Sequence, residues 1–225
     1  IEIPMNSELQ AIESHTFYES AINKICIPPH VKRIKKMAFF KCSQLRQVEI
    51  PENSELITIE EKAFYDCNVE SLTFPASLIE LENNWVDGSN SLAKISINPN
   101  NPRYLVYENK MIIGKSSIEK ENYNVLVFCL SDVEEIIIPN FIDTIARYMF
   151  KNCRKLKNVV FQDNSKILAI EDNMFLGSSI ESIYIAPQLT RICSSAFFLC
   201  SNLQRLEIPP NSELRIIESS AFACC

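Results

Sequence analysis

The chain repeats one short pattern of apolar and variable positions along its whole length. Each repeat begins with an apolar, variable, apolar triplet, which in most repeats is followed by proline. The triplets begin at Ile1, Ile25, Val48, Leu72, Ile95, Ile136, Val159, Ile183 and Leu206. This alternation is the period of a β-strand with one buried face, and proline ends a strand because it has no N–H for the next ladder bond. The pattern therefore predicts nine short strands.

The spacing of the triplets predicts how these strands are arranged. Successive triplets are 24, 23, 24, 23, 41, 23, 24 and 23 residues apart, so the interval of 41 is a 24-residue repeat with 17 extra residues. A unit this short cannot bury its apolar side chains alone and must stack on its neighbours. We therefore expect a single right-handed solenoid over residues 1–225, with about nine repeats and a parallel β-sheet on one face.

The second half of each repeat carries another apolar position, followed four and five residues later by a small residue and an aromatic one. An i, i+4, i+5 spacing is one face of a helix, and Ser194, Ser219 and Asp172 stand where a helix N-cap belongs. We predict a short helical turn there, which makes the fold an α/β repeat solenoid. Phenylalanine fills the aromatic position in seven repeats: Phe17, Phe39, Phe64, Phe150, Phe175, Phe197 and Phe222.

Two further positions hold similar residues in successive repeats, and we call each such set of equivalent positions a column. Three residues after the phenylalanine stands a cysteine or a serine, which we interpret as a small buried packing residue; a disulfide between stacked neighbours such as Cys42 and Cys67 stays open. The odd number of cysteines, nine, argues against a fully paired disulfide framework. An asparagine column follows the strands of the longer repeats, and we expect it to form corners in place of glycine. Its members are Asn6, Asn53, Asn100, Asn164 and Asn211.

Composition excludes several classes of function. Only three glycines are present and they are far apart, so no phosphate-binding glycine loop can form. The net charge of −6 argues against nucleic-acid binding, and the longest apolar run, Val125–Leu130, is too short to cross a bilayer. No Cys-x-x-Cys motif occurs and there are two histidines, so we expect no metal site of ordinary spacing and no cofactor. From the first residues we expect no signal peptide.

The repeat resembles the BspA-type leucine-rich repeat. The stretch from Leu45 to Pro51, followed by Leu56, Ile59, Ala63–Phe64 and Cys67, matches that pattern position by position, and the resemblance extends over essentially the whole chain. The resemblance implies a leucine-rich-repeat solenoid without catalysis, acting at the cell surface in adhesion to host cells, extracellular matrix or other microbes. Protein or glycan ligands are the partners that it implies. The Ile-, Asn- and Lys-rich composition is most similar to protozoan members, such as those of trichomonads.

Two regions depart from the repeat. Trp85–Ser89 replaces the usual Ala-Phe-x-x-Cys segment, so different packing is expected there. The extra residues predict a hairpin insertion at about 103–130, with an exposed polar tip at 115–122 that is one candidate for binding. Because the chain stops at Cys225 within a repeat, we expect it to be part of a longer repeat protein.

The outward positions of the sheet offer the main candidate for partner binding. In the first half of the chain they are polar, whereas Ile137, Val160 and Tyr184 form an apolar row on three consecutive strands. Adjacent exposed apolar residues often mark an interaction surface, although strand propensity or a covering hairpin would also explain them. The charged residues beside this row, Glu135, Arg205 and Glu207, complete the candidate site.

Catalysis finds little support in the sequence. Cys26 and His30 would suit nucleophilic catalysis, but two prolines between them prevent a helix from bringing them together. The adjacent carboxylates of Glu60–Glu61 and Glu134–Glu135 are expected to point apart and to be solvated, and not to form an acid–base pair. We therefore expect a recognition module, with an intracellular scaffold or regulatory domain as the alternative to a surface adhesin.

Overall fold

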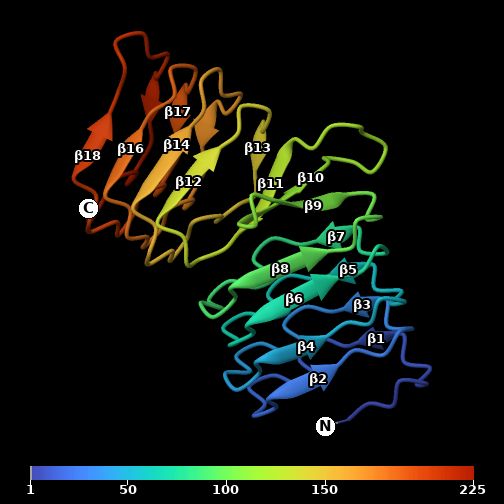
Figure 1. Cartoon of the computed structure of the whole chain (residues 1–225). Coiled ribbons are helices and arrows are strands. Elements are labelled where there is room, and N and C mark those ends of the chain that lie inside the picture. The colour runs from blue at the N-terminus through green and yellow to red at the C-terminus, as the bar shows by residue number, and fades with distance from the viewer. Residues whose placement is uncertain (1) are drawn as a thin grey trace. The chain divides into compact units, whose positions relative to one another are not determined.

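The computed structural model describes residues 2–225, which divide into two compact units. The first unit ends at Glu121 and the second is Asn122–Cys225. Each unit is a stack of coils in which parallel strands recur at the same place in successive coils (Figure 1). The expected parallel β-solenoid is confirmed.

Eight of the nine predicted triplets lie in two four-stranded parallel sheets. The sheet of the first unit contains β2 (Lys24–Cys26), β4 (Gln47–Glu49), β6 (Ser71–Phe74) and β8 (Lys94–Ile97). The sheet of the second unit contains β12 (Glu135–Ile138), β14 (Asn158–Phe161), β16 (Ser182–Tyr184) and β18 (Arg205–Glu207). In the first triplet, Ile1 lies outside the described residues, and Glu2 and Ile3 form no strand.

Equivalent triplet residues pair in register from one coil to the next. Ile25 faces Val48 in the first unit, and Ile136 faces Val159 in the second. The inward side chains are almost fully buried, with Ile25, Ile136 and Val159 each 1% exposed. Each such burial stabilises the fold by roughly 1.5–3 kcal/mol. The core is therefore a set of columns, one apolar residue per coil.

A second set of two-residue strands follows the sheet strands. In the first unit these are β1 (Ala11–Ile12), β3 (Arg33–Ile34), β5 (Thr58–Ile59) and β7 (Glu80–Leu81), which form one parallel sheet. In the second unit they are β13 (Thr144–Ile145), β15 (Ala169–Ile170), β17 (Arg191–Ile192) and β19 (Ile216–Ile217). The apolar residue that was expected to open a helical turn thus lies in a strand.

The predicted helical turns are wrong: the described residues contain no helix. The segment that follows each short strand has two residues with left-handed backbone four positions apart, such as Met37 (φ 56°) and Lys41 (φ 56°). A right-handed helix cannot continue through such residues. The N–H of Ala38 closes a turn on Lys35, while the next N–H, of Phe39, donates to the carbonyl of Ala63 in the adjacent coil (2.8 Å). Hydrogen bonds between coils therefore replace those within a helix.

Among residues 2–225, no helical segment is long and apolar enough to span a bilayer.

The phenylalanine column forms stacks of parallel rings. Phe39 stacks on Phe64 with centroids 5.0 Å apart, and Phe175 stacks on Phe197 at 4.9 Å. In the fourth repeat the stack ends because Trp85 meets Phe64 edge-on, at 89°. The different packing expected around Trp85 is confirmed.

The cysteine column has a second role besides packing. The Cys42 thiol donates to the Phe17 carbonyl of the preceding coil (2.8 Å), and the Cys200 thiol donates to Phe175 (3.0 Å). The Ser89 hydroxyl makes the same bond to Phe64 (2.8 Å), which explains why serine replaces cysteine in this column. All nine cysteines are free, so the disulfide considered for Cys42 and Cys67 is not formed.

The corner function expected of the asparagine column belongs mainly to the serine that follows it. Of the five asparagines, Asn164 alone has left-handed backbone (φ 59°). The Ser54 hydroxyl instead accepts the N–H of Leu56 (3.2 Å), and Ser165 accepts that of Ile167 (3.3 Å). A serine hydroxyl that bonds the backbone two residues later is a common turn device.

The residues after Pro102 form strands of their own. In the first unit β9 (Tyr104–Tyr107) pairs antiparallel with β10 (Met111–Gly114), through a turn with left-handed Glu108 and Asn109. Two consecutive left-handed residues are typical of tight hairpin turns. In the second unit β11 (Val125–Cys129) pairs in parallel with β13.

Candidate functional site

The apolar row in the second unit lies on the outward face of β12, β14 and β16. Ile137, Val160 and Tyr184 are 40%, 38% and 40% exposed, so about two fifths of each residue's surface reaches solvent. Ile137 pairs directly with Val160, and the same register continued places Tyr184 beside Val160. With strands about 4.8 Å apart, the three side chains form one continuous strip roughly 10 Å long.

The charged residues of the candidate site lie at the two edges of the same sheet. Glu135 is exposed on β12, at one edge. Arg205 and Glu207 lie on β18, at the other edge, and their side chains form an exposed ion pair (3.2 Å). Tyr184 pairs with Glu207 along the ladder, so the strip ends against this pair. An exposed ion pair adds little stability and is free to exchange partners.

The equivalent face of the first unit is polar, as the sequence predicts. Lys24 and Glu49 form an ion pair (2.6 Å) on β2 and β4. Gln47, Ser71 and Thr73 are also exposed there. An apolar outward row is thus a property of the second unit and not of the repeat itself.

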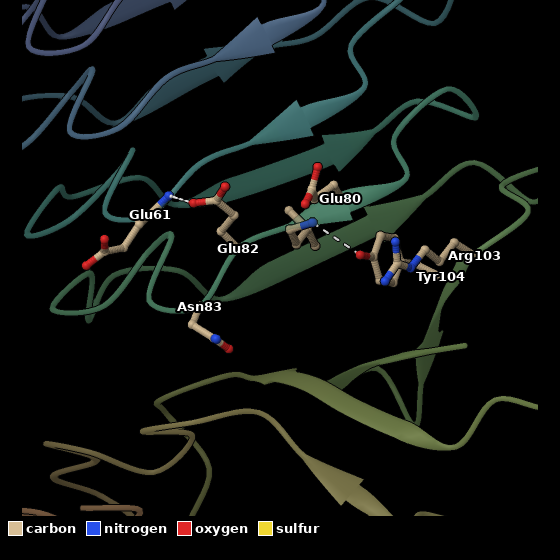
Figure 2. Close-up of a pocket in the computed structure, with 7 residues that line it drawn as sticks. Glu61, Glu80, Glu82, Asn83, Arg103 and Tyr104 are labelled. Atoms are coloured by element: carbon tan, nitrogen blue, oxygen red, sulfur yellow. Dashed lines mark hydrogen bonds between the residues drawn. The ribbon is translucent and has the colours of Figure 1, made fainter. Parts of the chain in front are cut away.

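A hollow of about 410 Å³ in the first unit is lined by several acidic side chains (Figure 2). Its lining consists of Glu61, Glu80, Leu81, Glu82, Asn83, Arg103 and Tyr104. Of these residues, the sequence drew attention to the carboxylate of Glu61 alone, as a member of the adjacent pair Glu60–Glu61. The feature of the sequence that could have identified them is the acidic character of the positions around the short strands, which becomes visible once the repeats are aligned.

The polar groups of this hollow mainly bond the coils to one another. Glu82 accepts the N–H of Glu61 (2.8 Å), and the buried Tyr104 hydroxyl accepts the N–H of Leu81 (3.1 Å). A hydrogen bond from Lys36 lowers the pKa of the Glu61 carboxyl, whereas burial raises the pKa of Tyr104. A catalytic acid would instead need a carboxyl pKa raised toward neutrality. The arrangement does not form an acid–base pair.

The residues considered for catalysis have separate partners. The Cys26 thiol contacts the sulfur of Met5 (3.4 Å), while His30 faces Glu55 (Nδ1 to Oε1, 3.1 Å). Glu60 forms an ion pair with Arg33 (2.8 Å). These are ordinary contacts between side chains of adjacent coils. They do not bring the Cys26 thiol next to the His30 imidazole.

The sequence matches one protein family over nearly its whole length. The family is described as "BspA type Leucine rich repeat region (6 copies)", and the match covers residues 10–124 and 121–225. No curated protein matches the chain.

Several solved structures share the fold. The pneumococcal vaccine antigen PcpA is 19% identical with a TM-score of 0.77, over 96% of this chain and 59% of that protein. A leucine-rich cell surface protein of Faecalibacterium prausnitzii A2-165 is 21% identical with a TM-score of 0.68, over 94% of this chain and 65% of that protein. A leucine-rich repeat protein of Eubacterium ventriosum ATCC 27560 is 19% identical with a TM-score of 0.72, over 94% and 59%. This chain therefore spans about three fifths of each.

These similarities bear on two of the expectations. The similar structures are of bacterial proteins, and the expected protozoan origin receives no support from them. At such low identity they show the fold alone. The family match and the stacked coils together show that the chain belongs to the BspA-type leucine-rich repeat family.

Proposed function

We propose that this chain is a non-enzymatic recognition module at the cell surface, and that it binds a protein partner through the strand face of its second unit. The observation that carries the proposal is the strip of Ile137, Val160 and Tyr184, whose members are each about two fifths exposed on neighbouring strands. Aromatic and aliphatic side chains flanked by charges are typical of the centre of a protein interface.

The surface location that we propose is supported by the descriptions of two similar structures. One of them is described as a vaccine antigen and another as a cell surface protein. A surface repeat protein that exposes an apolar strip suits adhesion to host-cell, matrix or microbial proteins better than glycan binding, because the strip offers few hydrogen-bonding groups.

The test compares two double variants with equal added charge. Ile137→Glu with Tyr184→Glu changes the strip, whereas Gln47→Glu with Thr73→Glu changes the equivalent polar face of the first unit. Binding is measured to immobilised fibronectin, laminin and collagen and to cultured epithelial cells. We expect at least a tenfold loss of binding for the first variant alone. Folded strip variants that bind as well as the wild type would refute the strip as the site, and a wild type that binds none of these would refute adhesion to them.

A second candidate, an intracellular scaffold or regulatory domain, is favoured by the nine free cysteines. Secreted proteins usually form disulfides, whereas intracellular ones keep their thiols reduced. Mass spectrometry of the alkylated natural protein separates the two: nine reduced thiols favour the intracellular role, and a native disulfide favours the surface.

A further inference from the structure

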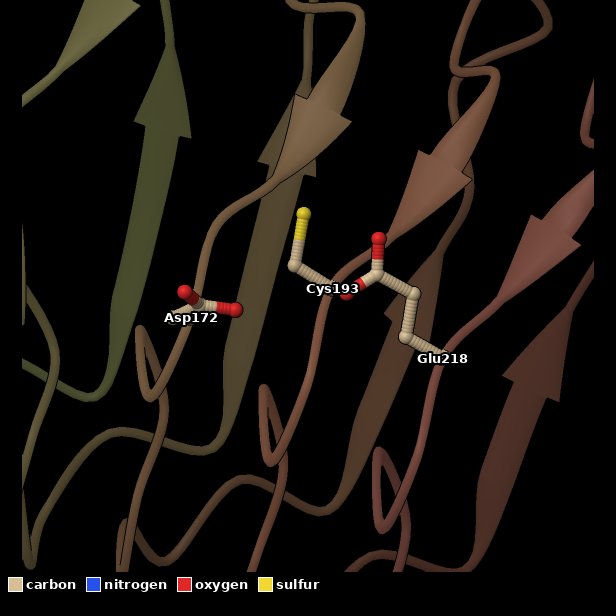
Figure 3. A group of neighbouring side chains, drawn as sticks. All are labelled: Asp172, Cys193 and Glu218. Atoms are coloured by element: carbon tan, nitrogen blue, oxygen red, sulfur yellow. The ribbon is translucent and has the colours of Figure 1, made fainter.

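Three side chains from three successive coils of the second unit converge at one place (Figure 3). Asp172, Cys193 and Glu218 each follow a short strand, β15, β17 and β19 respectively. One ligand atom from each residue lies within 4.8 Å of the other two. They are 21 and 25 residues apart in the chain, which is about one coil each, so no local sequence motif reveals them.

The Cys193 thiol differs from the thiols of the cysteine column. It lies outside that column, and most other coils have a charged residue in its place, such as Glu60, Glu82 and Glu171. The residue is 7% exposed, and among the described residues its thiol has no hydrogen-bond partner. Burial and the carboxylates of Glu171, Glu218 and Asp172 raise its pKa to about 11. The repeat therefore does not account for this thiol, whose sulfur lies within 4.8 Å of a carboxylate oxygen of Asp172 and of Glu218.

The two carboxylates are prepared for a ligand to different degrees. Glu218 Oε2 accepts the N–H and the hydroxyl of Ser194 (3.1 Å each), which fixes the side chain, and its Oε1 lies 3.7 Å from Arg191 Nη1. The same carboxylate-to-backbone bond occurs in other coils, where Glu60 accepts the N–H of Lys36 (2.9 Å). Asp172 is exposed and accepts no hydrogen bond among residues 2–225, so its carboxylate is free to turn.

We propose that Asp172, Cys193 and Glu218 bind a zinc ion that joins three coils of the second unit. One sulfur and two carboxylate oxygens form an acceptable ligand set for this borderline-soft ion, whereas calcium and magnesium bind oxygen ligands almost exclusively. Ligand atoms around a tetrahedral zinc are about 3.5 Å apart. Zinc binding therefore shortens the distances between the three ligand atoms by roughly 1 Å, mainly through a movement of the Asp172 side chain. The fourth position faces solvent beside Asp172 and takes a water molecule.

Binding changes the charge at the site in a definite way. The Cys193 thiol gives its proton to solvent and binds as a thiolate, so one proton is released per zinc bound. The cation offsets the mutual repulsion of the thiolate and the two carboxylates. This inference departs from the absence of a metal site expected from the sequence, and it is independent of the surface strip.

The first experiment measures zinc binding by isothermal titration calorimetry under reducing conditions. We expect one zinc per chain, with affinity reduced at least a hundredfold in Cys193→Ser. The matched control is Cys224→Ser with Cys225→Ser, which removes two exposed thiols from the last coil and should bind zinc like the wild type. Equal binding by Cys193→Ser, or no zinc binding by the wild type, would overturn the proposal.

Two further measurements keep the proposal testable if Cys193→Ser folds poorly. Asp172→Asn alters an exposed side chain, so it should keep the wild-type circular dichroism spectrum while binding zinc at least tenfold more weakly. Cobalt added in place of zinc should give a thiolate charge-transfer band in the near ultraviolet. A cobalt spectrum without that band, or unchanged zinc affinity in Asp172→Asn, would contradict the assignment.

Discussion

The side chain of Phe175 is packed between two other rings, those of Phe150 (5.1 Å) and Phe197 (4.9 Å). Phe175→Ala should lower the free energy of unfolding by about 3–5 kcal/mol, because it removes both ring contacts and leaves a cavity. Phe222→Ala should cost clearly less, since Phe222 stacks on one ring and is half-buried. Urea denaturation followed by circular dichroism measures both, and equal losses would show that stacking is not the reason.

Leu199 carries a bulky side chain on left-handed backbone, with φ of 61° and 51% exposure. This conformation costs a residue with a side chain roughly 1–2 kcal/mol, and glycine removes that cost at some loss of chain entropy. Leu199→Gly should therefore raise the free energy of unfolding by about 0.5–1 kcal/mol. Leu168→Gly is the control, because Leu168 is similarly exposed (58%) but does not have positive φ. This change should lower the free energy of unfolding, since glycine adds chain entropy and relieves no strain there. The same denaturation assay decides whether the two changes differ in sign.

Some residue properties can be predicted from this sequence and others cannot. The buried phenylalanine column is visible because its spacing and chemistry repeat. The left-handed residues are not visible, since Met37, Lys62 and Leu199 have no shared chemistry that favours positive φ. The N–H groups of Met37 and Leu199 donate to the carbonyls of Glu61 and Ala223 in the adjacent coil (3.2 and 3.0 Å), so the surroundings of this backbone depend on the stacked structure.

Among the elements, the short strand β7 depends on a side chain from the neighbouring hairpin. The Tyr104 hydroxyl accepts the N–H of Leu81 (3.1 Å) and donates to the carbonyl of Ile79 (3.3 Å). Tyr104→Phe should lower the free energy of unfolding by about 1–3 kcal/mol, because it leaves these groups without that partner. Hydrogen exchange of the Leu81 amide is the direct measurement, and unchanged protection would refute the role of the hydroxyl.

The same tyrosine gives a dependence on alkaline pH. Burial raises the pKa of Tyr104, so the folded chain holds a proton that the unfolded chain releases near pH 10. Its contribution to stability is therefore complete below about pH 10 and is lost as the pH rises through the folded value. Tyrosinate absorbance should show a late titration step for Tyr104, and Tyr104→Phe should remove that step. A titration curve with the same late step in the variant would contradict this.

The strands were predictable because alternation and proline act locally, whereas the helical turns were predicted wrongly. The i, i+4, i+5 spacing that suggests a helix also suits a chain of turns whose apolar residues point inward. Phe39 illustrates the difference, because its N–H bonds Ala63 in the next coil and not a residue of its own segment. The sequence of a single repeat does not show whether its N–H groups bond within their own segment or to the next coil.

In the whole molecule, a coil contacts mainly the coils before and after it. A destabilised coil should therefore lose protection together with its neighbours and leave distant coils unchanged. In Phe175→Ala, hydrogen exchange should accelerate around Phe150 and Phe197, while β2 and β4 keep their wild-type rates. Uniform acceleration over all coils would show a single cooperative unit instead.

The candidate surfaces differ in how far the sequence reveals them. The strip of Ile137, Val160 and Tyr184 could be predicted, because its members hold the same position in successive repeats. The group of Asp172, Cys193 and Glu218 could not, because Asp172 holds a different position in its coil from the other two. Its convergence depends on side-chain directions that only the folded coils define.

The column of buried thiols provides a natural probe of local opening in several coils. Cys42, Cys67, Cys153 and Cys200 lie at the same place in their coils and are shielded from reagents in the closed state. A thiol-specific label can reach each of them only when that coil opens, so its rate of modification gives the local opening free energy. The natural sequence thus allows opening to be measured coil by coil along the stack, without an engineered probe.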